Sequence, residues 1–128
     1  MTALPRVLVV EDDPEVQELV DQLLSTSGYD VRICGVGTEA WPLLRELRPD
    51  VVILDLMLPG MGGLELLVRL RADRLLAKTP VLVWSGAHDD LVLLRDRLHR
   101  LGCATLEKPF EVEALERVLR LLVSRDNC

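Results

Sequence analysis

The chain has 128 residues, of which 49% are hydrophobic and 28% charged, and its formal net charge is −6. This length and composition predict one globular domain with a substantial core, and the negative charge disfavours a broad contact with nucleic-acid phosphates. No apolar run approaches the roughly 18 residues that span a bilayer, and nothing near Met1 resembles a signal peptide. The cysteines, three in number, show no metal-ligand pairing. We therefore expect a cytoplasmic protein with no membrane contact and no direct nucleic-acid binding.

Short apolar or β-branched runs recur along the chain and predict strands at 6–10, 30–33, 51–54, 80–84 and 103–106. Segments with apolar residues at helical spacing alternate with them, at 13–27, 38–47, 63–73, 89–101 and 111–124. Asp13 is expected to cap the first helix. Its core face is predicted to consist of Val16, Leu19, Val20, Leu23 and Leu24.

Strands that alternate with helices predict an α/β fold, an open and mostly parallel sheet covered by helices on both faces. The run at 51–54 is apolar throughout, as expected of a strand buried on both sides. Right-handed crossovers place every strand-to-helix loop at the same edge of such a sheet. Ligands of these folds bind at that edge, near the carboxyl ends of the strands.

Polar residues collect at the predicted strand ends: Glu11 and Asp12, then Asp55, Ser85 and Lys108. Two carboxylates about 4 Å apart repel by roughly 4 kcal/mol at an effective dielectric of about 20, so the cluster requires a counter-charge. Lys108 supplies one positive charge, and an all-oxygen site with room for water suits Mg²⁺, with Mn²⁺ as a substitute. A carboxylate beside Mg²⁺, a lysine and a hydroxyl can accept a phosphoryl group, and Asp55 is the candidate nucleophile.

Four motifs extend this pattern over almost the whole chain: VVEDDP, VVILDLMLPGMGG, VLVWSGA and EKPF. In this order and at this spacing they resemble the CheY-like receiver domains of two-component response regulators. The resemblance implies a flavodoxin-like, doubly wound fold with a five-stranded parallel sheet in the order 2-1-3-4-5 and five helices. It also implies that residues 1–128 form a single receiver domain. Such a domain is a phospho-acceptor that assists its own phosphorylation and dephosphorylation, not an enzyme.

Carried over to this sequence, the resemblance makes Asp55 the phosphorylated residue. Asp12 and Asp55 would bind Mg²⁺ directly, Glu11 mainly through water, and Met57 through its backbone carbonyl. The phosphoryl donor would be a histidine kinase or a histidine phosphotransfer protein.

The same resemblance gives Ser85 and Lys108 the task of contacting the phosphoryl group, and it implies a cis bond between Lys108 and Pro109. Ser85 would move when the group arrives, and residue 105 would respond. Receiver domains usually have an aromatic residue at this place in the switch, whereas this chain has Thr105. How the switch works without that ring is left open by the sequence.

The expected output surface consists of helix 89–101, strand 103–106 and helix 111–124, facing a downstream effector protein or domain. In helix 111–124, the residues that suffice for a core face are Val112, Leu115, Leu119 and Leu122. The apolar residues beyond those needed for the two core faces are Val92, Leu93, Val118, Leu121 and Val123. They suggest a homodimer contact. The alternative is scattered surface leucines covered by arginine side chains.

Two other functions remain compatible with the residues. A phosphorylation-independent adaptor would use the same fold as a binding module, and Thr105 leaves this reading open. An aspartate-nucleophile phosphatase would need a second carboxylate two residues after Asp55, where Met57 stands. No effector domain follows the last predicted helix, so the chain is expected to be a stand-alone regulator or the receiver part of a longer protein.

Overall fold

The computed structural model describes residues 4–58, 61–86 and 88–126, with only the backbone described at 88–90 and 125–126. In this part of the chain one sheet forms from β1 (Arg6–Val10), β2 (Asp30–Cys34), β3 (Val51–Asp55), β4 (Val81–Ser85) and β5 (Ala104–Glu107). All neighbouring strands are parallel and follow the order β2-β1-β3-β4-β5. The flavodoxin-like α/β fold with strand order 2-1-3-4-5 is therefore confirmed.

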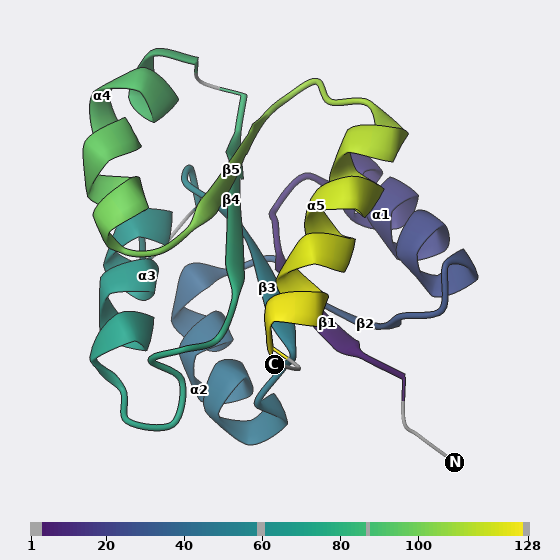
Figure 1. Ribbon diagram of the computed structural model, residues 1–128, viewed down its shortest axis with the longest axis horizontal. Helices are drawn as coiled ribbons and strands as arrows, with labels where there is room; N and C mark the ends of the chain where they lie inside the picture. Colours follow the sequence, from purple (N-terminus) through teal and green to yellow (C-terminus); the bar gives the residue numbers. More distant parts are fainter. Residues whose placement is uncertain (1–3, 59–60, 87, 127–128) are drawn as a thin grey trace.

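Helices cover both faces of the sheet (Figure 1). One layer consists of α1 (Pro14–Thr26) and α5 (Val112–Asp126), and the other of α2 (Gly37–Leu47), α3 (Gly63–Ala72) and α4 (His88–Arg100). None of the helices in the described chain is long and apolar enough to cross a membrane.

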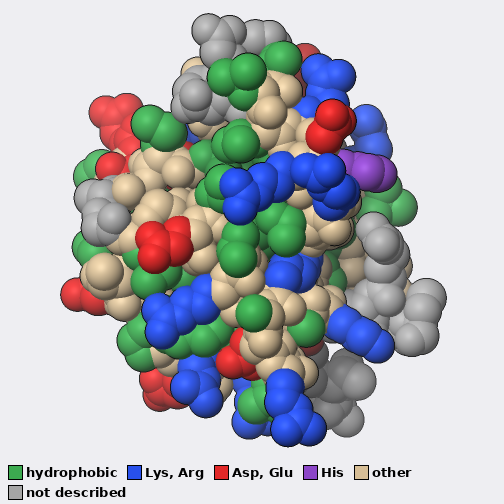
Figure 2. Space-filling model, turned by 90° about the vertical axis from the view of Figure 1, so that its left-hand side faces the viewer, with side chains coloured by type: hydrophobic (Ala, Val, Ile, Leu, Met, Phe, Trp, Pro, Cys, Tyr) green, Lys and Arg blue, Asp and Glu red, His purple; other side chains and the backbone are tan. Residues whose placement is uncertain are grey.

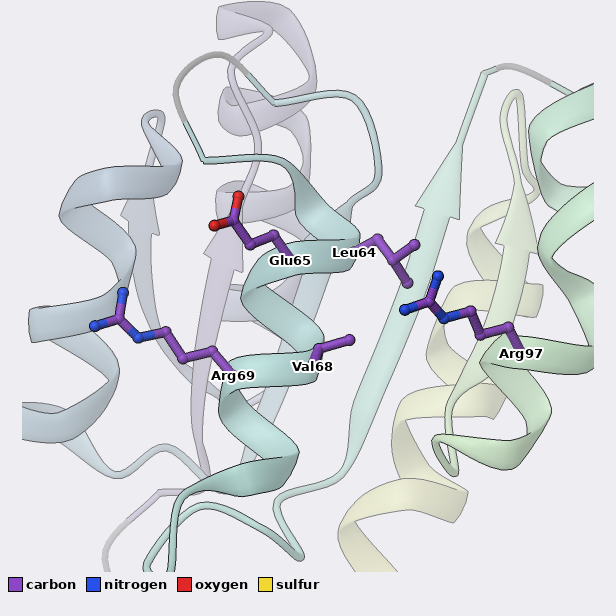
Figure 3. Close-up of a pocket in the computed structure, with 5 residues that line it drawn as sticks. All are labelled: Leu64, Glu65, Val68, Arg69 and Arg97. Atoms are coloured by element: carbon purple, nitrogen blue, oxygen red, sulfur yellow. The ribbon is translucent and has the colours of Figure 1, made fainter.

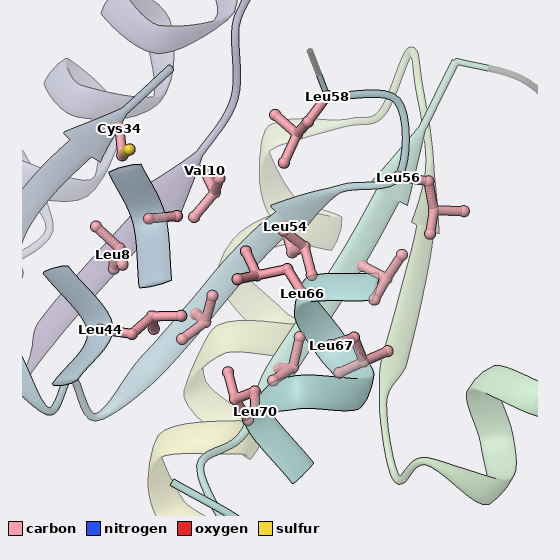
Figure 4. Packing of buried hydrophobic residues seen from close by; sticks show 14 of the residues in the cluster. Leu8, Val10, Cys34, Leu44, Leu54, Leu56, Leu58, Leu66, Leu67 and Leu70 are labelled. Atoms are coloured by element: carbon pink, nitrogen blue, oxygen red, sulfur yellow. The ribbon is translucent and has the colours of Figure 1, made fainter. Parts of the chain in front are cut away.

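The core lies in two parts, one on each side of the sheet. Successive strand residues point to opposite faces, so Val81 and Val83 pack towards α2, α3 and α4, while Leu82 and Trp84 pack towards α1 and α5. Figure 4 shows the first of these clusters, in which leucines of α3 lie against β3. Every residue of β3 and β4 is buried, which explains why both strands read as continuous apolar runs.

The predicted core face of α1 was wrong at one position. Val20 and Leu24 are buried, and Val16 and Leu23 are partly buried, but the Leu19 side chain is 54% exposed. At about 100° per residue, Leu19 lies roughly 120° around the helix from the midpoint between Val20 and Leu24. It is therefore beyond the stripe that a helix lying flat on a sheet can bury.

The last helix also differs from the prediction. Leu115, Leu119 and Leu122 are buried as expected, but Val112 is 39% exposed in the first turn. Val118 and Val123, predicted to be surplus, pack partly against the core instead. The buried stripe of α5 is thus wider than the one predicted. The helix packs on β3 and β4, and it shares a core cluster with the neighbouring α1.

Arg71, in the last turn of α3, connects loops at the end of the strands opposite the polar residues. Its guanidinium group donates hydrogen bonds to the carbonyls of Leu101 at 2.6 Å, Ala77 at 3.1 Å and Thr79 at 2.6 Å. These bonds tie the loop after α3 to the end of α4. They fix the C-terminal end of α4. The polar residues lie at the opposite end of the strands.

Candidate functional site

The polar residues predicted from the strand ends do meet at one edge of the sheet. Glu11 and Asp12 follow β1, Asp55 ends β3, Ser85 ends β4, and Lys108 follows β5. Their alignment follows from the strand register, which pairs Asp55 with Trp84 and Ser85 with Glu107. Parallel strands that end together therefore gather residues from distant parts of the sequence.

Three carboxylates form the centre of the site. One oxygen from each of Glu11, Asp12 and Asp55 lies within 4.8 Å of the others. The Glu11 residue is fully buried and Asp55 is 5% exposed, whereas Asp12 reaches solvent. Buried like charges at this separation repel strongly, so positive charge is needed to hold them together. Oxygen ligands in this arrangement have the chemistry that hard divalent cations prefer.

Lys108 supplies the positive charge within the protein. Its Nζ lies 2.5 Å from Oε1 of Glu11 and 3.3 Å from Oδ2 of Asp55. Burial by itself lowers the pKa of Lys108, but the hydrogen bonds and charges of Glu11 and Asp55 raise that pKa above its ordinary value. The ammonium group is therefore fully protonated at neutral pH and bridges two of the three carboxylates.

Backbone amides hold the remaining oxygens of these carboxylates. The Met57 N–H donates to Oδ1 of Asp55 at 2.9 Å, and the Asp13 N–H donates to Oε2 of Glu11 at 3.0 Å. The orientation of the Asp55 carboxylate is thus fixed by an amide on one oxygen and an ammonium on the other. Asp13 itself caps α1, as predicted, by accepting a hydrogen bond from the Glu15 N–H at 2.9 Å.

The other predicted residues lie around this centre at different depths. Ser85 is fully buried, and its carbonyl accepts a hydrogen bond from the Lys108 N–H at 2.9 Å. The Met57 side chain is 60% exposed, so its contact with the site is made by its backbone. Thr105 lies exposed on β5 and pairs with Val83, which is two residues before Ser85 on β4. The Lys108–Pro109 bond is cis, as the resemblance implied.

Two aromatic residues complete the surroundings of Lys108, and neither was predicted to belong to the site. The Lys108 Nζ lies 5.4 Å from the centroid of the Trp84 ring. On that ring stacks Phe110, with the two centroids 5.0 Å apart and the planes at 16°. The sequence signal was their position, since Trp84 directly precedes Ser85 and Phe110 follows Pro109.

A separate groove of about 530 Å³ lies between α3 and α4 (Figure 3). Its walls are formed by Leu64, Glu65, Val68, Arg69 and Arg97. Arg97 reaches from α4 towards Leu64, whereas Arg69 extends towards α2 and lies 4.7 Å from the ring of Trp41. None of the predicted site residues lines this groove.

Comparison with known proteins decides the family. The model of the family described as "Response regulator receiver domain" matches residues 7–120. The chain belongs to this family. Receiver domains of this kind are signalling modules of two-component systems rather than classical enzymes.

Relatives of known name support this assignment. The DNA-binding response regulator MtrA of Mycobacterium tuberculosis is 37% identical over 128 residues, which cover 98% of this chain and 54% of the relative. The DNA-binding dual master transcriptional regulator RpaA of Synechocystis is 35% identical over 125 residues, which cover 95% of this chain and 50% of the relative. The chain thus spans about half the length of these relatives.

Solved structures resemble the fold over almost its full length. A response regulator described as putative, from Chloroflexus aurantiacus, superposes with a TM-score of 0.87 at 30% identity, covering 94% of this chain and 98% of that one. The receiver domain of a sensor histidine kinase from Pseudomonas aeruginosa gives a TM-score of 0.84 at 26% identity, covering 95% of this chain and 99% of that one. That neighbour has a magnesium ion coordinated in its active-site cleft.

The pairing of Lys108 with two buried carboxylates predicts a pH-dependent loss of stability in Lys108→Met. Removing one partner of a buried ion pair leaves uncompensated charge, and we expect about 2–4 kcal/mol of lost unfolding free energy at pH 7 without divalent cations. Because the pKa of Lys108 is raised in the folded state, its contribution is present at pH 7 and is lost as the pH rises through that pKa, so the deficit should shrink above the ordinary lysine value of 10.5. Urea unfolding at pH 7 and at a pH above 10.5, both in a chelating buffer, measures this.

The chain's other lysine provides the control. Lys78 is exposed, so Lys78→Met should change the unfolding free energy by no more than about 0.5 kcal/mol at either pH. Equal losses in the two variants would show that the Lys108 ion pairs contribute nothing particular to the fold.

Proposed function

We propose that this chain is the phosphorylation-activated receiver of a His-to-Asp phosphorelay and that Asp55 is the phosphoryl acceptor. The observation that carries this proposal is the position of the Asp55 carboxylate at the end of β3, held by the Met57 N–H and facing the Lys108 ammonium. The donor is a histidine kinase or a histidine phosphotransfer protein. Residues 1–128 act as one receiver domain in the cytoplasm.

In the transfer, a carboxylate oxygen of Asp55 attacks the phosphorus of a phosphohistidine. The new P–O bond gives an acyl phosphate, while the P–N bond breaks and its electron pair returns to the imidazole. Negative charge on the phosphoryl oxygens is then stabilised by the Lys108 ammonium and the Ser85 hydroxyl. Lys108 is close to Asp55 before transfer, so only a short movement away from Glu11 is needed.

We infer that Mg²⁺ is the cofactor and that Mn²⁺ can substitute for it. The residues fit such an ion, because Asp12 reaches solvent and has Asp55 beside it, while Glu11 is already engaged by Lys108. In this arrangement Asp12, Asp55 and the backbone carbonyl of Met57 would hold the ion directly and Glu11 through water. When bound there, the ion would supply positive charge against the developing negative charge of the phosphoryl group. The magnesium in the Pseudomonas neighbour supports the choice of metal.

The output of the phosphorylated chain is a change in its contacts with other proteins. Because the named relatives are DNA-binding regulators about twice as long as this chain, the partner we propose is an effector protein or an attached effector domain. This chain itself, with its net charge of −6, would not contact DNA.

A second contact that we propose is a homodimer through α4, β5 and α5. Leu93 on α4 is 80% exposed and Leu121 on α5 is 62% exposed. On the face that includes α4, apolar side chains lie among arginine and lysine side chains (Figure 2). Such a mixture is typical of protein interfaces.

Sedimentation of the chain saturated with Mg²⁺ and acetyl phosphate tests the dimer. We expect a dimer that Leu93→Asp and Leu121→Asp disrupt, because each would bury an unpaired charge in the interface. Leu19→Asp serves as the control, since Leu19 is a leucine of similar exposure on α1. A phosphorylated wild-type chain that stays monomeric, or equal effects of all three substitutions, would contradict this contact.

Asp55→Asn tests the acceptor role. We expect wild-type protein incubated with Mg²⁺ and acetyl phosphate to gain the mass of one phosphoryl group, and Asp55→Asn to gain none, because an amide is a poor nucleophile. Intact-mass spectrometry measures both. Asp13→Asn is the matched control, since it also removes one carboxylate near the site while keeping a helix-capping side chain. Label on Asp55→Asn equal to that on wild type would overturn the proposed function and leave the adaptor reading.

Asp12→Asn tests the metal site. Because Asp12 is a proposed direct ligand, the substitution should weaken Mg²⁺ binding by at least about tenfold. Isothermal titration calorimetry with MgCl₂ measures the affinity, again with Asp13→Asn as the control. If both variants bind Mg²⁺ as tightly as the wild type, the ion does not lie on Asp12.

A further inference from the structure

Trp84 is placed between the proposed phosphoryl site and α5. Its indole is fully buried and has contacts on two sides, with the Lys108 ammonium over the ring and the Phe110 ring stacked on it. In the sheet Trp84 is paired directly with Asp55 on β3, and the Trp84 carbonyl accepts a hydrogen bond from the Leu56 N–H at 3.2 Å. One residue thus adjoins both the acceptor and the cation that faces it.

The chemistry of the indole indicates that Trp84 acts through the face of its ring and not through a hydrogen bond from its N–H. The buried Nε1–H of Trp84 has no hydrogen-bond partner in the described chain, and a buried unpaired donor is destabilising. A leucine or phenylalanine would fill the core at this point without that cost. Tryptophan presents the largest and most electron-rich face for a cation, and the Lys108 Nζ lies within the distance at which such attraction operates.

From Trp84 the contacts continue into α5 and not into α4. Phe110 lies two residues before α5 begins, and both rings belong to the same core cluster as Leu115 and Leu119 of that helix. The Lys108 ammonium and the Phe110 ring both contact the Trp84 indole, so a displacement of the ammonium also acts on the stacked ring. Thr105 is exposed, with no ring of its own to form such a contact.

We propose that Trp84 is a positioning residue, which holds Lys108 over its ring within reach of Asp55 and, through Phe110, conveys occupancy of the site to the first turns of α5. The inference rests on the proposed function and adds to it the route by which the phosphoryl group acts on the protein surface. When the phosphoryl group attracts the ammonium, the cation shifts across the indole face and the Trp84–Phe110 stack adjusts. The partner-binding surface that responds therefore includes the exposed start of α5.

The test uses the full chain with Mg²⁺ and beryllofluoride, a stable analogue of the aspartyl phosphate. Amide NMR shifts of residues 112–119 report the response of α5, and a beryllofluoride titration reports the affinity of the site. Trp84→Leu removes the ring, and Trp84→Phe keeps a smaller one. Trp41→Leu is the matched control, because Trp41 also lies beneath a cation, Arg69, but lines no part of the proposed site.

We expect Trp84→Leu to lose most of the α5 shift at saturation and about three- to tenfold in beryllofluoride affinity, as expected for loss of a cation–π contact. Trp84→Phe should recover part of both effects, and Trp41→Leu should match the wild type. A residue that merely fills the core would change stability without this graded recovery. An α5 response in Trp84→Leu equal to that of the wild type would overturn the inference.

Phe110→Leu keeps the inference testable if Trp84→Leu does not fold. It leaves Lys108 over the indole but removes the stacked ring, so beryllofluoride should still bind while the α5 response is lost. Unchanged α5 shifts in Phe110→Leu would contradict the proposed route. Failure of the wild-type chain to bind beryllofluoride would instead overturn the proposed function, and this inference with it.

Discussion

The repulsion among Glu11, Asp12 and Asp55, and its compensation by Lys108, is the constraint on which the site depends. Carboxylates buried this close would separate or bind protons unless the surrounding structure held them. Here Asp55 ends a strand that is buried along its whole length, and Glu11 follows one that is buried for most of its length. The apolar packing of the sheet therefore stabilises an arrangement that its polar end, by itself, would oppose.

Lys108 is suited to this task because it is attached at two points. Its N–H is bonded to the Ser85 carbonyl, so the backbone after β5 is fixed to the end of β4, while the ammonium remains on a flexible stem. A fixed backbone with a movable charge allows the lysine to hold the resting carboxylates and still follow a new negative charge. At the opposite end of the strands the Arg71 side chain donates hydrogen bonds to four backbone carbonyls, so its charge has no comparable freedom to move.

Much of this could be predicted from the sequence, because alternating strands and helices, strand-end carboxylates and the cap at Asp13 are local patterns. Their meeting at one edge follows from the handedness of parallel folds. The exposure of Leu19 could not be predicted, because periodicity identifies an apolar face but not how much of it the sheet can cover. The Trp84–Phe110 stack was missed for a related reason. It depends on register between β4 and the chain after β5, which composition and spacing do not specify.

The end of β4 connects the site to both helical layers at once. Side chains alternate along a strand, so Ser85 continues the row of Val81 and Val83 that faces α4, while Trp84 lies in the row that faces α1 and α5. Two adjacent residues beside the acceptor thus belong to different cores. A rearrangement of this strand end would alter packing on both sides of the sheet, since close-packed interiors transmit displacements instead of absorbing them. Thr105 is exposed, whereas Trp84 is buried against Phe110 and so connects the end of β4 to the layer that contains α5.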